Sequence, residues 1–260
     1  MSEVDTQPMV AINDLKMHFP IRKGIFQRVV GHVKEVDGVS FDIKPHETLG
    51  LVGESGSGKT TIGRCIVRDY LPTSGEIIFN DAGNPVNLAQ LSNVALKPYR
   101  RKVRMVFQDP FSSLNPRMTV FEILSEPLRI QKLDQHADEM EGLIADMLIN
   151  VGLRPEFMRR YPHAFSGGQR QRIGIAKALI LRPEILVADE AVSALDVSVR
   201  AQILNLMKDL QELYNLPYLF ISHDLSVVKY LADRVAVMYV GRLVEIGETR
   251  AMYRRPLHPY

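Results

Sequence analysis

Cysteine is almost absent from this chain of 260 residues, which contains Cys65 alone. A single cysteine cannot build an intrachain disulfide framework or a cysteine-based metal cluster, and its scarcity is typical of a reducing compartment. Long apolar runs are also missing, since none approaches the roughly 20 residues of a membrane-spanning helix, and no basic-then-apolar signal peptide opens the chain. We therefore expect a chain that is neither exported nor inserted in a membrane.

An excess of either charge is lacking as well. The 32 Lys and Arg residues against 30 Asp and Glu residues give a formal net charge of +2. This balance excludes binding of duplex DNA by overall charge, although a local basic face remains open. Hydrophobic residues make up 46% and charged residues 24%, which is globular composition rather than that of collagen, tails or mucins. At about 150 residues per domain, the length suits one large or two small domains.

Short apolar segments predict a sheet with parallel strands. Near-alternating apolar residues predict a strand over 33–43, and apolar runs predict buried strands over 48–52, 185–188 and 218–221. The first of these runs leads into a glycine-rich loop and a helix predicted over 61–70, ahead of a proline. The other two are followed by polar residues and a helical pattern, so the sequence indicates an α/β fold.

A helical region lies between these strands. Apolar residues at helical spacing predict a helix over 134–151 with Gly152 as C-cap, and prolines punctuate a helical insertion over about 111–165. A second helix is predicted over 199–213. Its Met and Leu stripe, like that of the first, is predicted to be core rather than a cofactor site.

The glycine-rich loop has the spacing Gly, four residues, Gly, Lys and Ser or Thr. It reads Gly53, Glu54, Ser55, Gly56, Ser57, Gly58, Lys59, Thr60, with Thr61 next. Backbone N–H groups of such a loop converge on phosphate oxygens, because glycine allows the required backbone angles. Lys59 is expected on the β- and γ-phosphates and Thr60 on Mg²⁺, with the helix N-terminus facing the anion. A flexible Gly/Ser loop is the alternative, but the flanking strand and helix favour nucleotide binding.

Two carboxylates follow the predicted strand 185–188. Asp189 and Glu190 stand at its carboxyl end, where open α/β sheets bind ligands. We expect Asp189 to hold Mg²⁺, directly or through water, and Glu190 to orient or deprotonate an attacking water. Alone, such a pair is more often a solvated loop, and the phosphate loop favours the catalytic interpretation.

Other strand ends carry further candidates. His223 follows 218–221 and is a candidate for contact with the γ-phosphate or the attacking water, although a lone histidine there is usually a surface or packing residue. Gln108 follows a strand predicted over 103–107 and is a candidate for Mg²⁺. We expect these strand ends to converge on one phosphate.

A second helix N-terminus stands out at Ser166, Gly167, Gly168 and Gln169. Ser166 and Gln169 have the spacing of a capping box, which is also the simple structural explanation. Capping explains the two glycines less well. They would expose N–H groups to an anion at a positive helix end, so the segment predicts a second phosphate-binding surface.

In chain order these motifs resemble those of an ATP-binding cassette (ABC) ATPase. The correspondence is Walker A at 53–60, the Q-loop at Gln108, the signature at 166–169, the Walker B end at Asp189 and Glu190, the D-loop at 193–196 and the switch histidine at His223. The resemblance covers nearly the whole chain. It implies an α/β phosphate-loop NTPase (RecA-like) core with an N-terminal antiparallel β subdomain and an inserted α-helical subdomain.

The resemblance also implies a domain organisation. A single ABC ATPase domain is expected over 8–255, with the β subdomain and core at about 8–110, the helical subdomain at about 111–178, and core with switch region at about 179–255. Residues 256–260 are expected to start a C-terminal extension that relatives continue.

The resemblance further implies ATP and Mg²⁺ as cofactors and a head-to-tail dimer of two cassettes. Walker A of one cassette and the signature of the other would then enclose each ATP. Phe19 is expected to stack on adenine, with Phe26 as the alternative.

A narrower resemblance lies in the strings 108–117, 192–198 and 256–260. They are similar to the ATPases of bacterial dipeptide and oligopeptide importers, whose relatives carry nickel, glutathione or oligosaccharides. This implies a peripheral subunit at the cytoplasmic face of the inner membrane. Its partners would be a second ABC ATPase, identical or paralogous, two integral membrane permeases and, indirectly, an extracytoplasmic solute-binding protein, with no nucleic acid. The stretch 110–127 would receive a permease helix.

Two features depart from that subfamily. Ala191 follows Glu190 where the family usually has Pro, which should alter loop rigidity more than chemistry. Relatives continue into an extension that can carry cysteines for an iron–sulfur cluster, whereas Cys65 is predicted to be core packing, so we expect no such cluster.

Other functions remain as alternatives. A soluble ABC ATPase acting on ribosomes or DNA would normally carry two cassettes or a long coiled-coil insertion. A phosphate-loop kinase would need neither the signature nor the switch histidine. The transported solute cannot be read from this sequence.

Overall fold

The computed structural model describes residues 7–108, 114–133 and 137–258. The chain folds into two compact units: the first comprises Met1–Lys97 and Pro217–Tyr260, and the second comprises Pro98–Leu216. The subdomain boundaries expected from the sequence stay predictions.

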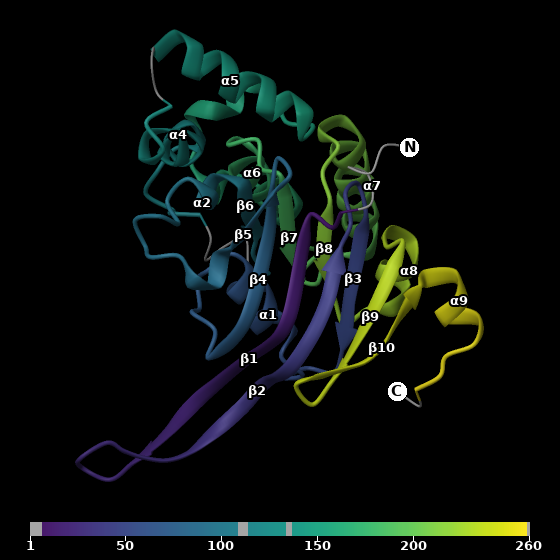
Figure 1. Ribbon diagram of the computed structural model, residues 1–260. Helices are drawn as coiled ribbons and strands as arrows, with labels where there is room; N and C mark the ends of the chain where they lie inside the picture. Colours follow the sequence, from purple (N-terminus) through teal and green to yellow (C-terminus); the bar gives the residue numbers. More distant parts are fainter. Residues whose placement is uncertain (1–6, 109–113, 134–136, 259–260) are drawn as a thin grey trace. The chain divides into compact units, whose positions relative to one another are not determined.

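The first unit contains two groups of strands with short helices. Its elements are β1 (Val10–Lys23), β2 (Arg28–Ile43), β3 (Thr48–Gly53), α1 (Lys59–Ile66), β4 (Ser74–Asp81), β5 (Asn84–Asn87), η2 (Leu88–Gln90), β8 (Tyr218–Ile221), α8 (Leu225–Leu231), β9 (Arg234–Tyr239), β10 (Arg242–Glu248) and α9 (Thr249–Arg254). Figure 1 labels most of them.

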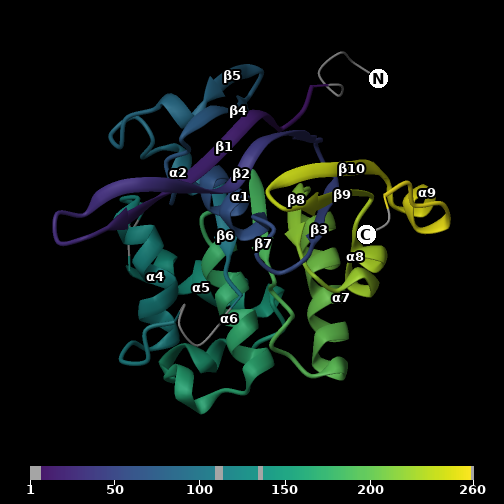
Figure 2. The ribbon, with the colours of Figure 1, turned by 90° about the horizontal axis from the view of Figure 1, so that it is seen from below.

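An antiparallel sheet in the order β2-β1-β4-β5 forms one part of this unit. β1 and β2 stay paired up to Lys23 and Arg28, whereas β4 pairs with β1 only as far as Lys16 and Ser74. The β1–β2 pair therefore extends past β4 as a long hairpin, which points to the lower left in Figure 1 and to the left in Figure 2.

Strands β10, β9, β3 and β8 lie side by side in that order. β3 is parallel to both β8 and β9, and every residue of β3 and β8 is buried. The apolar runs 48–52 and 218–221 are thus confirmed as buried parallel strands. Their apolar side chains avoid water on both faces, which is the main driving force for this arrangement.

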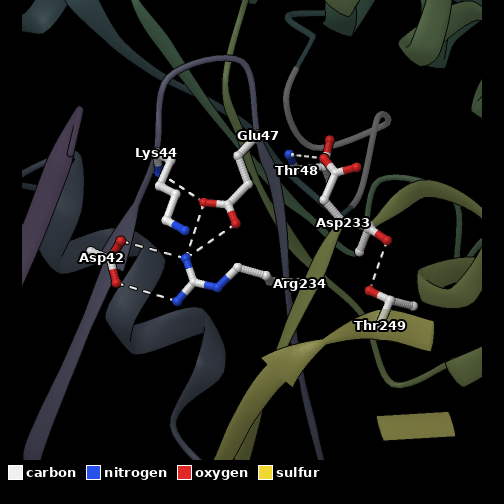
Figure 3. A network of polar contacts seen from close by, with 8 residues as sticks. Asp42, Lys44, Glu47, Thr48, Asp233, Arg234 and Thr249 are labelled. Atoms are coloured by element: carbon white, nitrogen blue, oxygen red, sulfur yellow. Dashed lines mark hydrogen bonds and ion pairs between the residues drawn. The ribbon is translucent and has the colours of Figure 1, made fainter. Parts of the chain in front are cut away.

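Hydrogen bonds and ion pairs of charged side chains connect the start of β3 with the start of β9 (Figure 3). Arg234 donates from Nη1 to both carboxylate oxygens of Glu47, at 3.1 and 3.2 Å, and from Nη2 to Asp42 at 3.3 Å. The N–H of Thr48 donates to Asp233 Oδ2 at 2.9 Å. These contacts fix the end of β3 that lies opposite its glycine-rich loop.

The second unit carries most of the longer helices. Its elements are α2 (Tyr99–Lys102), β6 (Val103–Val106), α4 (Val120–Ile130), α5 (Ala137–Asn150), η3 (Pro155–Arg159), η4 (Pro162–Ala164), α6 (Gly167–Leu179), β7 (Ile185–Asp189) and α7 (Val197–Tyr214). β6 and β7 are parallel, and β7 is buried throughout, as its apolar run predicts.

The helices predicted in this unit are present. The helix expected over 199–213 is α7, and that expected over 134–151 is α5, although 134–136 lie outside the described residues. Met140 and Ile144 are buried, as the periodicity predicts, whereas Leu143 is 42% exposed. The apolar stripe of α5 is therefore core on most of its length.

Two boundaries differ most from the sequence-based expectation. The helix predicted over 61–70 is α1, which ends at Ile66, because Arg68 adopts a left-handed conformation with φ of 59° and turns the chain out of the helix. The strand predicted over 33–43 is β2, which begins at Arg28 because the hairpin pairs it with β1 further out. Among the described residues, no helix has the length and apolar character needed to cross a membrane.

Candidate nucleotide site

The glycine-rich loop joins β3 to α1, and its glycines are required by the backbone. Gly56 and Gly58 have φ of 79° and 98°, a region that favours glycine. A Cβ on Gly53 would lie 2.2 Å from the Met238 carbonyl oxygen, and one on Gly58 would lie 2.3 Å from that of Glu35. The loop therefore passes close against its neighbours, with Gly58 as the N-cap residue of α1.

Lys59 lies folded across this loop. Its Nζ donates to the carbonyl oxygens of Gly53 and Glu54, at 2.8 and 2.7 Å, and to Ser57 Oγ at 3.3 Å. Lys59 is 5% exposed, whereas Glu54 and its neighbours Ser55 and Gly56 are exposed. A buried ammonium at a helix N-terminus, beside an open run of backbone N–H groups, fits the phosphates of a nucleotide.

Glu35 of β2 braces the start of α1. The Thr61 hydroxyl donates to Glu35 Oε1 at 2.5 Å, and Thr61 is 3% exposed. The N–H of Gly241, in the turn between β9 and β10, donates to the Ser57 carbonyl at 3.2 Å. Glu35 could not be identified from the sequence, because no local pattern links it to a loop more than 20 residues later. The loop and the start of α1 are thus hydrogen-bonded to β2 on one side and to the β9–β10 turn on the other.

Phe19 lies on β1, half-buried, and its ring meets that of Tyr70 edge-on, with centroids 5.6 Å apart. The preceding residue, His18, is held by Asp37, with Nε2 and Oδ1 3.0 Å apart. The hydrogen bond from Arg242 and, to a lesser extent, the one from His18 keep the pKa of the Asp37 carboxyl below its usual range. Phe26, the alternative, is 85% exposed at the tip of the hairpin. Phe19 is therefore the better placed of the two, and its role stays a prediction.

His223 lies just beyond the end of β8. In the β3–β8 ladder Leu51 pairs with Ile221, so Gly53 and His223 each stand two residues past that pair, at the same edge. His223 is exposed, and Asp224 caps α8 by accepting from the Ser226 N–H at 2.9 Å. The register therefore brings the histidine and the glycine-rich loop to one edge of the first unit.

A corresponding edge exists in the second unit. Val106 of β6 pairs with Ala188 of β7, so Gln108 and Glu190 each lie two residues past the pair. Gln108 Nε2 donates to Glu190 Oε2 at 2.8 Å. Asp189 is 3% exposed, at the last position of β7. The structure thus brings together two of the predicted catalytic side chains, Gln108 and Glu190, and Asp189 directly precedes Glu190 in the chain.

The start of α6 has the predicted capping box. Ser166 Oγ accepts from the Gln169 N–H at 3.3 Å, and Gln169 Oε1 accepts from the Ser166 N–H at 3.0 Å. Gly168 has a packing reason, because a Cβ there would lie 2.4 Å from Val199 Cγ1 on α7. Close packing thus explains this glycine, and the expected contact of both glycines with an anion stays a prediction. Gly167 lies only partly buried at the helix N-terminus.

A depression of about 500 Å³ opens beside this helix N-terminus. Ser166, Gln169 and Arg172 contribute to its wall. It combines the positive end of a 13-residue helix with a guanidinium, an environment that fits an anionic group.

The chain is similar to curated proteins of one family. The family profile described as ABC transporter matches residues 36–193. Oligopeptide transport ATP-binding protein AppF of Bacillus subtilis is 52% identical over 261 residues, which cover 100% of this chain and 78% of AppF. OppF of the same organism is 52% identical over 255 residues, covering 98% and 80%. Glutathione import ATP-binding protein GsiA of Salmonella typhimurium is 52% identical over 257 residues, but the chain spans 40% of its length.

Solved structures agree with this assignment. The dimeric ATP-binding cassette MJ0796 in a post-hydrolysis state, bound to ADP and Pi, matches with a TM-score of 0.79 and 26% identity over 93% of this chain and 99% of that one. CbiO1 from Clostridium perfringens, with a TM-score of 0.79 over 95% and 91% of the two chains, is 23% identical and supports the fold alone. The expected phosphate-loop NTPase fold is confirmed, and the chain belongs to the ABC transporter family as an ATP-binding, ATP-hydrolysing cassette.

Proposed function

We propose that this chain powers an ABC importer for peptides or related small solutes as its ATP-hydrolysing subunit. The observation that carries the proposal is the 52% identity to AppF and OppF, oligopeptide transport ATP-binding proteins, across nearly the whole chain. GsiA, at the same identity, is named for glutathione import, so the proposed solute class includes glutathione as well as peptides.

The residues of the loop would bind the nucleotide. Backbone N–H groups of 53–60 would surround the phosphates, with Lys59 on the β- and γ-phosphates, Thr61 adjoining the loop and Phe19 stacked on adenine. Lys59 is held over the loop by backbone carbonyls and is therefore close to this position before nucleotide arrives. Mg²⁺, held by Thr60, Gln108 and Asp189, would neutralise charge that develops on the phosphates.

Glu190 would act as general base. Its carboxylate would accept a proton from water as the water oxygen bonds to the γ-phosphorus and the bond to the β–γ bridging oxygen breaks. The amide of Gln108 already holds Glu190 through one oxygen. His223 would steady the γ-phosphate or the attacking water.

A second cassette would complete each site. The Ser166 helix end and its Arg172-bordered depression would face the γ-phosphate bound by the partner cassette. The dimeric MJ0796 cassettes, 26% identical to this chain, support such pairing. The partner of this chain would be an identical copy or a paralogue.

Permeases would dock on the second unit. Residues 110–113 of the expected docking stretch 110–127 lie outside the described residues, but its later part reaches α4. A hollow of about 730 Å³ lined in part by Thr119, Phe121 and Met158 adjoins that helix. Its mixture of apolar and charged walls suits a short amphipathic helix of a permease.

Reconstitution tests the proposal. The chain would be co-expressed with a paralogous cassette and two permeases, purified as a complex and placed in vesicles to measure ATP-dependent peptide uptake. Uptake that is lost with Lys59→Ala supports the proposal. Failure to assemble with any permease, together with ATPase activity stimulated by ribosomes, DNA or an acceptor hydroxyl, would overturn it.

A further inference from the structure

Within the described residues, no other element pairs with the outer part of the β1–β2 hairpin. From Phe19 to Val33 the two strands pair with each other alone in the described part of the chain. Every residue from 20 to 30 is exposed. An isolated two-stranded ribbon is marginally stable in water, so an apolar ribbon of this kind has a physical reason to find a partner.

The tip of the hairpin is apolar. The N–H of Gln27 donates to the Gly24 carbonyl at 3.1 Å, which closes a turn with Ile25 and Phe26 at its centre. Turn centres usually hold Gly, Pro, Asn, Asp or Ser. Ile25 and Phe26 are 96% and 85% exposed, and among the described residues no other large apolar side chain is more exposed.

The ribbon behind the tip carries both apolar and basic side chains that are exposed. Ile21 and Gly31 pair across the ladder, and Ile21 and Val33 are exposed apolar residues on one face, whereas Val29 pairs with Arg22 beyond a register shift. The alternate positions on the other face include His32 and Lys34.

Positive charge surrounds the apolar tip. Arg22, Lys23 and Arg28 flank it directly. Between Asp14 and Glu35 the chain contains no acidic residue. Apolar side chains that protrude beyond a ring of cations match an anionic bilayer, in which acyl chains lie beneath negative headgroups.

We propose that the hairpin tip docks the cassette on anionic phospholipid, with Ile25 and Phe26 inserted at the headgroup level and Arg22, Lys23 and Arg28 on lipid phosphates. The inference goes beyond the proposed function, resting on it only for the nearby membrane. It assigns to this chain a lipid contact of its own, in addition to any contact with permeases.

Tryptophan fluorescence tests this insertion. The chain contains no Trp, so Ile25→Trp places a single reporter at the tip of the full-length protein. Vesicles of phosphatidylcholine with about one third phosphatidylglycerol should shift its emission to the blue, and brominated lipid should quench it. Val94→Trp, at a side chain that is 84% exposed elsewhere in the same unit, should show neither effect.

Vesicle flotation separates the contribution of the apolar tip to vesicle binding from that of the three cations. Ile25→Asp should weaken binding to the anionic vesicles at least about tenfold. Replacing Arg22, Lys23 and Arg28 by Gln should weaken it about a hundredfold, at roughly fivefold per charge, and remove its salt dependence. Val94→Asp should bind as the unaltered chain does.

ATPase activity of the same proteins keeps this inference apart from the proposed function. Ile25→Asp should hydrolyse ATP normally while it loses the vesicles. Equal flotation of Ile25→Asp and the unaltered chain, or no blue shift of Ile25→Trp, would overturn the lipid contact and leave the ATPase proposal standing. Binding of the hairpin to a purified permease but not to vesicles would also overturn it.

Discussion

The side-chain amide of Gln108 donates a hydrogen bond of 2.8 Å to the Glu190 carboxylate. The two residues follow adjacent parallel strands at the same register, two positions past the pair Val106 and Ala188. Glu190 itself has φ of 46°, a left-handed conformation that is uncommon outside glycine, and its carbonyl accepts from both the N–H and the Oγ of Ser193 at 3.0 Å. The backbone turn and the amide together determine where the carboxylate lies.

Gln108→Ala should therefore release Glu190 without unfolding the chain. We expect kcat for ATP to fall at least about threefold, the value of one net hydrogen bond, because the variant also loses a proposed Mg²⁺ ligand, and we expect a smaller change in KM. Steady-state ATPase kinetics of the purified protein measure both. Gln90→Ala, an exposed glutamine in the first unit, is the matched control and should leave both constants unaltered. A large rise in KM with unchanged kcat would show that Gln108 serves ATP binding instead.

Glu35→Ala should loosen the phosphate loop. It removes the acceptor of the buried Thr61 hydroxyl, and a hydrogen bond to a charged group corresponds to roughly tenfold or more in affinity. Calorimetric titration with ATP measures the loss, and Glu35→Gln, which keeps an acceptor oxygen, should recover part of it. The exposed Glu248→Ala provides the control. Unaltered ATP affinity in Glu35→Ala would show that Glu35 does not support the nucleotide-binding loop.

Ser166 allows capping and phosphate contact to be separated. Ser166→Ala should lower stability by about 1 kcal/mol, because it removes the N-cap of α6. Ser166→Asp keeps a good N-cap but adds a carboxylate where a phosphate is expected, so its melting temperature should match that of the unaltered chain while ATPase activity falls about a hundredfold. Thermal denaturation measures the stability of each variant, and ATPase assays measure its activity. Full activity of Ser166→Asp would reduce Ser166 to a helix cap.

Cys65 should report unfolding. It is fully buried on α1, and burial raises the pKa of its thiol to about 12. Because the thiolate is the reactive form, iodoacetamide at mildly alkaline pH should modify the folded chain very slowly and the denaturant-unfolded chain readily. The stabilising effect of keeping this thiol neutral is full below its unfolded pKa of about 8.5 and is lost as pH rises toward about 12. Mass spectrometry that finds rapid modification of folded protein would contradict its burial.

The short buried strands and the glycine-rich loop could be predicted from the sequence, because each depends on local composition. Apolar runs marked β3 and β7, and the capping box of Ser166 and Gln169 is local by nature. Apolar runs and family motifs indicated where the candidates stand in the chain, whereas the contact between Gln108 and Glu190 is seen only in the structure.

Contacts between distant segments could not be predicted in this way. Glu35 and Thr61 meet only because β2 passes beside α1. Gly168 has no room for a side chain, because Val199 of α7 packs against it. The outer part of the β1–β2 hairpin could not be predicted from the sequence. Its two strands pair only with each other among the described residues, and neither the apolar tip nor its cations follow a strand pattern. Tertiary packing, rather than local propensity, decides these features.

The rate of ATP hydrolysis by Glu190→Gln decides whether Glu190 is the general base. Glu190 is proposed as the general base, and its loss should lower turnover roughly 10² to 10⁴-fold. The amide keeps the size of the side chain, so ATP binding measured by calorimetry should be retained. Hydrolysis at close to the unaltered rate, with binding intact, would contradict the assignment of this edge as the catalytic centre.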